Sequence, residues 1–195
     1  MQTVGVDEAG VGPAFGSMWA AAVALNEDTD PSGFRDSKKL THSSRLRLAE
    51  RIRTTLPYGL GEVTHNEIDE LGMAECRRLV FERALDDYAS KTGVEPKRII
   101  VDGQIFRRWR DAVHECHNRA DDTFPAVSAA SILAKTTRDA QILQICENDP
   151  LFDQRYKIKK NKGYLSPEHI AGLCEHGFSE LHRKTYKIKG FNRMI

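Results

Sequence analysis

The stretch "TVGVDEAGVGP", residues 3–13, opens as a short apolar strand and then places two acids and two glycines in succession. We expect residues 3–6 to form a buried strand, and Gly10 and Gly12 to form a tight turn. Asp7 and Glu8 then lie next to the hydrophobic interior, where an unpaired negative charge is costly. Positive charge must therefore compensate the two carboxylates.

Further acids follow other segments of the chain. Asp102 comes after the apolar run "RIIV", residues 98–101, and is followed by Gly103, whereas Asp121 and Asp122 precede a predicted helix. Side chains at strand ends beside glycine turns form the sites of α/β sheets. Four acids from three segments repel one another unless divalent cations lie between them. Oxygen ligands alone indicate Mg²⁺ or Mn²⁺ rather than zinc.

The geometry of a strand limits this interpretation. Successive residues face opposite sides, so Asp7 and Glu8 share a site only if the backbone turns or bulges there. On spacing alone an alternative stays open, in which Asp7 is a turn residue, Glu8 is solvated and Asp102 caps a loop. The number of carboxylates does not decide between the two interpretations.

The rest of the chain alternates strands and helices. Expected strands cover residues 3–6, 15–25, 58–64, 98–101 and 112–116, and expected helices cover residues 43–56, 66–90, 128–147 and 167–176. Ser43 or Ser44 is expected to cap the first helix, Ser128 the third and Ser166 the last, with Pro167 at its first helical position. This order predicts an α/β fold with one mixed central sheet flanked by helices.

Composition suits an ordinary globular protein, with 40% apolar and 29% charged residues among 195, and we expect one domain over residues 1–195. We find no signal peptide and no apolar run long enough to cross a bilayer, so we expect a cytoplasmic protein with reduced cysteines. Residues 151–195 carry ten Lys or Arg against four acids. That segment is either a surface for a polyanion or a solvated tail.

Several strings together resemble the ribonuclease HII family. In order along the chain they are "DEAG-G-P" from Asp7, "DSKKL" from Asp36, "EIDEL" from Glu67, "VDG" from Val101, "RAD" from Arg119, "VSAASILAKTTRD" from Val127 and "HRKTY" from His182. The resemblance implies a ribonuclease H-like fold. It also implies an endonuclease that cuts the RNA strand of RNA–DNA hybrids and incises at single ribonucleotides in duplex DNA.

The resemblance also assigns roles to residues. It implies that two ions, Mg²⁺ or Mn²⁺, promote hydrolysis to 5′-phosphate and 3′-hydroxyl ends. The family's metal-binding acids match Asp7, Glu8, Asp102 and Asp121, with Asp122 as the alternative to the last. Nucleic-acid contacts are expected from Gly10, Val11, Gly12, Lys38, Lys39, Ser128, Ser131, Lys135, Tyr164 and Arg183, and from the basic run Lys157, Lys159, Lys160 and Lys162.

One position departs from the family, because Val11 stands where its members usually have Arg. Valine neither donates hydrogen bonds nor neutralises a phosphate, so we expect weaker substrate binding or looser recognition of the RNA-to-DNA junction. Two other functions stay open, a catalytically silent hybrid-binding protein and a nuclease of the same fold with another substrate. We expect a monomer, since no segment indicates a large apolar interface.

Overall fold

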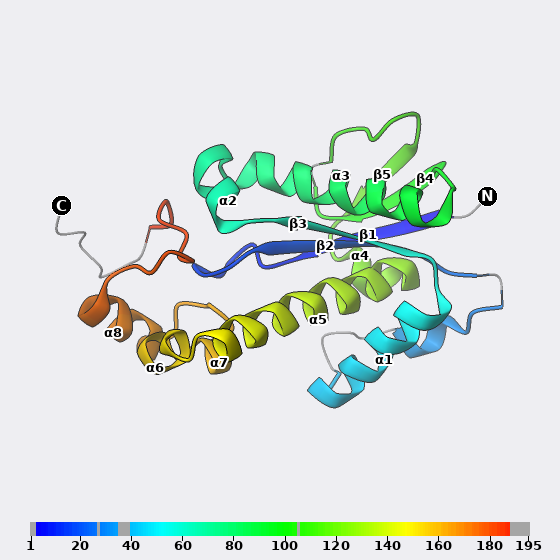
Figure 1. Cartoon of the computed structure of the whole chain (residues 1–195). Coiled ribbons are helices and arrows are strands. Elements are labelled where there is room, and N and C mark those ends of the chain that lie inside the picture. Colours follow the sequence, from blue (N-terminus) through cyan, green and yellow to red (C-terminus); the bar gives the residue numbers. More distant parts are fainter. Residues whose placement is uncertain (1–2, 27, 35–39, 105, 188–195) are drawn as a thin grey trace.

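The computed structural model describes residues 3–26, 28–34, 40–104 and 106–187. A five-stranded mixed sheet with the order β3-β2-β1-β4-β5 forms its centre (Figure 1). Strands β1 (Thr3–Ala9), β2 (Met18–Ala24) and β3 (Tyr58–Val63) make an antiparallel meander. Strands β4 (Arg98–Asp102) and β5 (Val113–His117) continue the sheet parallel to β1.

Helices cover both faces of this sheet, as Figure 1 shows. Helices α2 (His65–Leu71) and α3 (Met73–Thr92) lie on one side, and α1 (His42–Thr55) and α5 (Pro125–Asn148) lie on the other. The shorter elements are a 3-10 helix (Pro31–Phe34), α4 (Ala120–Thr123), α6 (Leu151–Tyr156), α7 (Ile158–Asn161) and α8 (Pro167–His176). This arrangement confirms the expected α/β fold.

The alternation of side chains along β1 sorts the core into two halves. Val4 and Val6 pack toward α3, where Val80 and Phe81 complete the contact. Gly5 faces α5 instead, and a Cβ atom there would lie 2.3 Å from the backbone of Ala126. Only glycine permits this close approach of strand and helix, because any Cβ would clash with backbone atoms.

Two predicted helix boundaries differ from the structure. The expected helix 66–90 is interrupted at Gly72, whose φ of 77° and ψ of 158° end α2 and begin α3 in a new direction. Helix α1 is capped by Thr41 rather than by Ser43 or Ser44, since the Thr41 side chain accepts the Ser44 amide hydrogen bond. In both places several polar or small residues compete for one boundary, and packing selects among them.

The start of α5 was also wrong by one turn. Pro125 takes the first helical position after the N-cap Phe124, where its missing N–H costs nothing. Ser128 is therefore not a cap. The last helix agrees with the sequence, with Ser166 as N-cap and Gly177 after its final residue. In the described part of the chain no helix is long and apolar enough to cross a membrane.

Candidate active site

The acids predicted from strand ends meet at one edge of the sheet. The parallel pairing of β1 with β4 ends at Val6 and Val101, so Asp7 and Asp102 are the next residues on neighbouring strands. Asp102 also anchors the start of α4, because its Oδ1 accepts a 2.6 Å hydrogen bond from the Ala120 amide. Three separate segments of the chain therefore converge where β1 and β4 part.

The fourth acid comes from α4, a short helix that was not expected from the sequence. Asp121 is only 3% exposed and follows the residue that Asp102 holds. Asp122 is exposed, and its Oδ2 lies 2.7 Å from Arg119. A buried carboxylate beside Asp102 is better placed to bind a metal ion than a carboxylate that faces solvent, so Asp121 is the better candidate ligand.

Asp7 and Glu8 do not share a side of the sheet. Strand β1 runs without a bulge to Ala9, pairing Asp7 with Ala21 and Glu8 with Ala20. Asp7 therefore faces α5, and Glu8 faces α3, where Nη2 of Arg77 donates to its Oε1 at 2.6 Å. The bulge that a shared site would require is absent, because the ladder with β2 is regular. As the side chains stand, no three His, Cys, Asp or Glu groups among the described residues could hold a metal ion together.

The charges of these acids nevertheless act on one another. Burial raises the pKa of Asp7 well above its usual value, the neighbouring charges of Glu8 and Asp102 raise it further, and the Ser131 hydroxyl counteracts this by a hydrogen bond. Burial also raises the pKa of Glu8, while Arg77 lowers it and Asp102 raises it. Burial and the mutual repulsion of the acids thus disfavour the charged forms of both carboxylates.

The donor chemistry of this edge suits a hard divalent cation, although no three of the described acids share one point as the side chains stand. Oε2 of Glu8 is buried and accepts no hydrogen bond from the described residues. An orphaned carboxylate oxygen beside two further acids is costly unless a cation approaches it. Carboxylate oxygens are also the donors that Mg²⁺ and Mn²⁺ prefer. Asp7, Glu8, Asp102 and Asp121 are the residues that would hold such ions.

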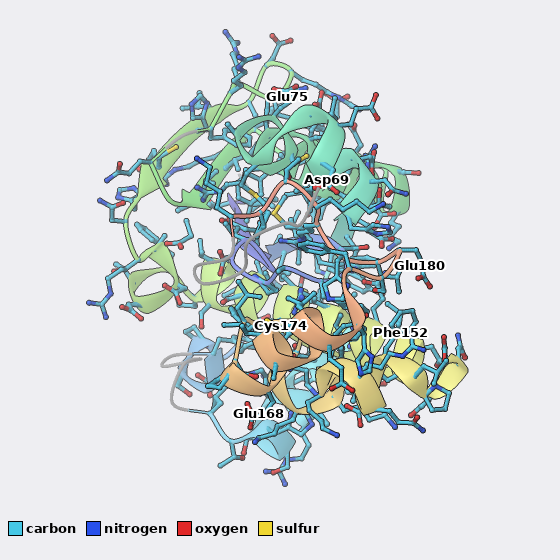
Figure 2. The ribbon with its side chains drawn as sticks, turned by 90° about the vertical axis from the view of Figure 1, so that its left-hand side faces the viewer. Asp69, Glu75, Phe152, Glu168, Cys174 and Glu180 are labelled. Carbon is cyan, nitrogen blue, oxygen red and sulfur yellow. The ribbon has the colours of Figure 1, made fainter. Side chains whose placement is uncertain are left out.

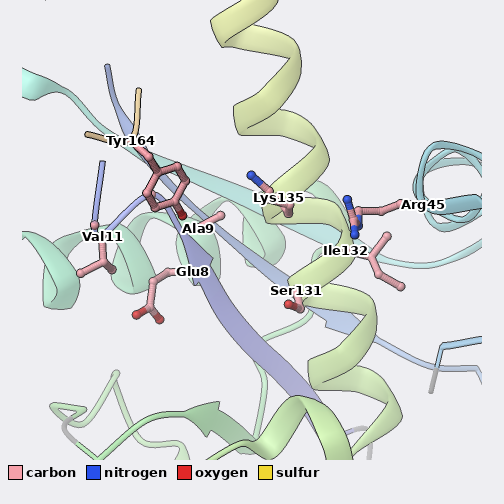
Figure 3. A pocket seen from close by; sticks show the side chains of 10 residues that line it. Glu8, Ala9, Val11, Arg45, Ser131, Ile132, Lys135 and Tyr164 are labelled. Atoms are coloured by element: carbon pink, nitrogen blue, oxygen red, sulfur yellow. The ribbon is translucent and has the colours of Figure 1, made fainter. Parts of the chain in front are cut away.

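A cleft of about 490 Å³ extends from Glu8 along the glycine turn (Figure 3). Figure 3 shows the Tyr164 ring on one side of the cleft and Ser131 and Lys135 of α5 on the other. Six of the expected nucleic-acid contacts line it, namely Gly10, Val11, Gly12, Ser131, Lys135 and Tyr164. Arg45 of α1 lines it as well. Arg45 was not predicted from the sequence, although its place in the helix after "DSKKL" was a usable signal.

Two expected nucleic-acid contacts are wrong, because the side chains are buried. Ser128 donates its hydroxyl hydrogen to the Phe34 carbonyl inside the fold. Arg183 is fully buried and donates to the carbonyls of Gly16 at 2.9 Å and Val11 at 3.2 Å. Arg183 therefore holds the glycine turn from behind and does not contact a phosphate. Lys38 and Lys39 lie outside the described residues.

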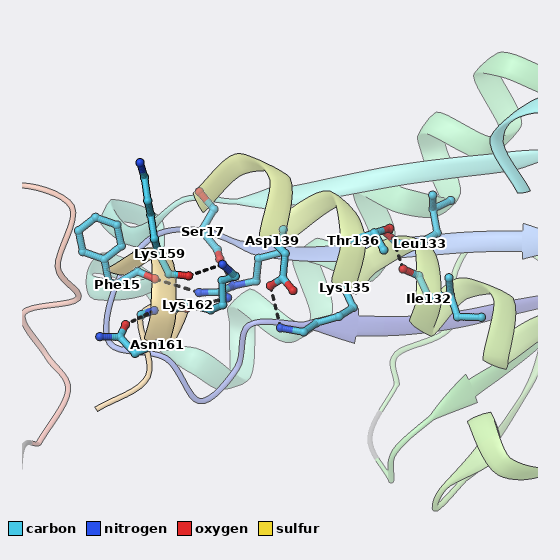
Figure 4. A network of polar contacts seen from close by, with 12 residues as sticks. Phe15, Ser17, Ile132, Leu133, Lys135, Thr136, Asp139, Lys159, Asn161 and Lys162 are labelled. Carbon is cyan, nitrogen blue, oxygen red and sulfur yellow. Dashed lines mark hydrogen bonds and ion pairs between the residues drawn. The ribbon is translucent and has the colours of Figure 1, made fainter. Parts of the chain in front are cut away.

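Arg138 stands next to Asp139 in the sequence, but its side chain is buried. Its guanidinium donates to the carbonyls of Phe15 and Ser17, each at 3.1 Å, and of Lys162 at 3.0 Å (Figure 4). It also fills the space beside Gly10, where the φ of 101° and a Cβ contact of 2.5 Å exclude other residues. Asp139 pairs with Lys135 at 2.7 Å, which leaves Lys135 on the rim of the cleft.

Tyr164 is held through a pair of buried histidines. The Nδ1 of His169 lies 2.9 Å from the Tyr164 carbonyl, and its Nε2 lies 2.9 Å from Nε2 of His182. The amide of Ser179 donates to Nδ1 of His182 at 2.9 Å. His182 thus has a structural role, because its contacts hold α8 and the Tyr164 backbone in place.

The mixed sheet, its two helical layers and the acids at the β1–β4 edge define a ribonuclease H-like protein. The chain belongs to the ribonuclease HII family, since the family model described as Ribonuclease HII matches residues 4–189. It is 37% identical over 187 residues to Ribonuclease HII of Bacteroides thetaiotaomicron, covering 95% of this chain and 90% of the relative. The protein is accordingly a metal-dependent endonuclease that acts on RNA–DNA hybrids.

Solved structures have the same fold. The ribonuclease H2 from Pyrococcus horikoshii matches with a TM-score of 0.77 and 27% identity, covering 96% of this chain and 94% of that one. Bst-RNase HIII in complex with Mn²⁺ matches with a TM-score of 0.68 and 20% identity, covering 90% of this chain and 70% of that one. The second likeness concerns the fold alone.

Proposed function

We propose that Asp7, Glu8, Asp102 and Asp121 bind two divalent cations, Mg²⁺ or Mn²⁺, that hold the scissile phosphate of the RNA strand. The convergence of these acids at the β1–β4 edge, with an unpartnered oxygen on Glu8, is the observation that carries the proposal. When bound, the ions supply the charge that activates the attacking water and stabilises the leaving 3′-oxygen. The products then carry 5′-phosphate and 3′-hydroxyl ends.

The walls of the cleft position the substrate in this proposal. Lys135 and Arg45 place positive charge along the cleft, where they contact phosphates of the bound strand. Ser131 keeps Asp7 oriented through its hydroxyl. These contacts recognise the backbone and carry no base specificity, so binding weakens as salt is raised.

We also propose that the enzyme incises at single ribonucleotides in duplex DNA. A Cβ atom on Gly12 would lie only 3.4 Å from Cε1 of Tyr164, so the turn and the ring face the same part of the cleft. Backbone groups at Gly10 and Gly12 are then available to a 2′-hydroxyl, the group that distinguishes RNA from DNA. The ring of Tyr164, which is exposed, is available to stack on the following deoxyribose.

A cleavage assay tests both proposals. The substrates are a DNA duplex with one ribonucleotide and a uniform RNA–DNA hybrid, each with Mg²⁺ or Mn²⁺, and Asp102→Asn is the control. Cutting on the 5′ side of the lone ribonucleotide, abolished in the control, is expected. Cutting of the uniform hybrid alone would refute junction recognition but leave the nuclease. Binding of both substrates without cutting would instead favour the silent hybrid-binding protein.

Three further expectations stay proposals, namely one domain, a monomer and a cytoplasmic location. In support of a monomer, the large apolar side chains exposed in the described residues are scattered over different elements, among them Leu46, Val94, Val113 and Leu151. Light scattering on the purified protein tests the oligomeric state.

A further inference from the structure

The cationic group of Arg77 in α3 bonds directly to Glu8, one of the proposed metal ligands. Its Nη2 lies 2.6 Å from Oε1 of Glu8, a short charge-assisted hydrogen bond. The guanidinium also reaches the second acid-bearing strand end. A Cβ atom on Gly103, the residue after Asp102, would lie 3.2 Å from the same nitrogen.

The pairing between Arg77 and Glu8 is incomplete on both sides. Oε2 of Glu8 and Nε of Arg77 are both buried, and neither has a hydrogen-bond partner in the described part of the chain. A bidentate pair would use both carboxylate oxygens, but here one bond joins the two groups. The bond is short but single, so a stronger cation can replace the guanidinium.

The exposure of the two side chains differs in a way that permits such a replacement. The Glu8 side chain is 9% exposed and fixed to the central strand, whereas that of Arg77 is 35% exposed at the end of a flexible stem. Arg77 can therefore turn toward solvent, and Glu8 cannot. A divalent ion at Glu8 would also repel the guanidinium, because both would then lie against one carboxylate.

We propose that Arg77 is a resident counter-cation that compensates Glu8 when no metal is bound and lowers the affinity of the site for divalent ions. This inference rests on the proposed metal site. In the metal-free protein the guanidinium limits the repulsion between Glu8 and Asp102. On metal binding the single Arg77–Glu8 bond breaks, and the cost of breaking it reduces the observed affinity.

The test measures Mn²⁺ binding by electron paramagnetic resonance and calorimetry, without substrate. Arg77→Gln is expected to bind Mn²⁺ at least about tenfold more tightly than the wild type, because competition and repulsion act in the same direction. Arg77→Lys keeps the charge and should stay closer to the wild type. The metal-free Arg77→Gln protein should melt at a lower temperature than the metal-free wild type. Its melting temperature should also rise more than that of the wild type when Mn²⁺ is added.

Arg78→Gln is the matched control. Arg78 is the next residue of α3, and its Nη2 bonds to Glu75 at 2.6 Å, away from the strand ends. The same loss of charge should change Mn²⁺ affinity less than about twofold. Circular dichroism verifies that each variant is folded.

The outcomes separate this inference from the proposed function. Mn²⁺ binding that is lost in Asp102→Asn but unchanged or weaker in Arg77→Gln would overturn the inference alone, and Arg77 would then orient Glu8 for the metal. Mn²⁺ binding that is equal in the wild type and Asp102→Asn would overturn the proposed metal site and this inference with it. If Arg77→Gln and Arg78→Gln raised the Mn²⁺ affinity equally, the effect would come from the lost positive charge in general, and the inference about Arg77 would be overturned.

Discussion

Asp121 and Asp122 show how one step along the chain changes the chemistry open to a side chain. Both are carboxylates in the single turn of α4. Asp121 is buried, and it follows Ala120, whose amide donates a hydrogen bond to Asp102. Asp122 forms an ion pair with Arg119 at the surface. Residue type and spacing are the same for both, so only their orientation in the folded protein distinguishes them.

Asp121→Asn should therefore lower cleavage of a uniform hybrid at least about 100-fold, because a lost ligand removes transition-state stabilisation of several kcal/mol. Asp122→Asn should stay within about threefold of the wild type, since an exposed ion pair contributes little. Single-turnover rates at saturating Mg²⁺ test this. A severe loss in Asp122→Asn with an active Asp121→Asn would reverse the assignment.

Val11 is the other residue at which one side chain should change function. It packs against the core beside the glycine turn, and its carbonyl accepts hydrogen bonds from Arg183 and Tyr186. The backbone of the turn is thus held independently of the Val11 side chain. A substitution there alters the contact with substrate more than the shape of the turn.

Val11→Arg should bind ribonucleotide-containing duplex several-fold more tightly. One added phosphate contact should also steepen the dependence of log K on log salt by about 0.9. Fluorescence anisotropy on an Asp102→Asn background measures both quantities, with Val11→Ala as the control. An unchanged affinity together with an unchanged cleavage position would contradict the prediction.

At the scale of elements, α8 is joined to the C-terminal segment by the His169–His182 contact. Phe15 forms an isolated bridge with His182, and the His182 ring stacks edge-on against that of Tyr156 at 4.7 Å. Figure 2 shows this end of the molecule, with Asp69 of α2 beside the same C-terminal segment. Asp69 accepts hydrogen bonds from the amides of Lys184 and Thr185 at 2.7 and 2.9 Å.

His182 makes this junction sensitive to acid. Burial and then the charge of His169 lower its pKa from 6.5 to about 3. The pKa of His182 is lower in the folded protein than in the unfolded chain, so the unfolded chain binds a proton more readily. The fold therefore loses stability as the pH falls from about 6.5 toward 3. Between pH 7 and pH 5 the wild type should lose about 2 kcal/mol more than His182→Gln. Urea unfolding at both values measures this, and equal losses would contradict it.

Some helix boundaries can be predicted from local sequence patterns alone. Helix α8 was predicted with its cap and its end, because Ser166, Pro167 and Gly177 act locally. The break at Gly72 and the start of α5 at Pro125 were not predicted. Gly72 can continue a helix or break it, and Pro125 can stand in an extended segment or at the first position of a helix, so the tertiary fold decides between them.

At the scale of the whole molecule, Arg138 connects distant parts of the chain. It donates from α5 to the segment after the glycine turn and to the end of α7, at three carbonyl oxygens. Its guanidinium is fully buried, no carboxylate of the described residues bonds to it, and burial lowers its pKa to about 10. Such a group stabilises the fold only while all its acceptors stay in place.

Arg138→Met should lower the free energy of unfolding by about 3 kcal/mol, because it leaves three buried carbonyls without this donor. Lys135→Met, one turn earlier on α5, should change stability by less than about 1 kcal/mol and instead weaken hybrid binding. Urea unfolding and hybrid binding, measured on both variants, test the contrast. Loss of stability in Lys135→Met with none in Arg138→Met would contradict it.

The amino-acid sequence by itself determined the α/β class, the family and the segments that carry Asp7, Glu8 and Asp102, although β1 continues to Ala9 and does not end before Asp7. These follow from local hydrophobic patterns and motif order, which act over a few residues. Only the tertiary structure decided that Asp7 and Glu8 face opposite helices, that Arg77 meets Glu8, and that Asp121 rather than Asp122 is buried.

The burial of Arg138, Arg183 and Ser128 was also a tertiary outcome. A basic or hydroxyl side chain has the same local pattern whether it meets a phosphate or a buried carbonyl. The difference depends on which distant segments fold over it, because long-range packing sets the burial of a group and the partners within its reach.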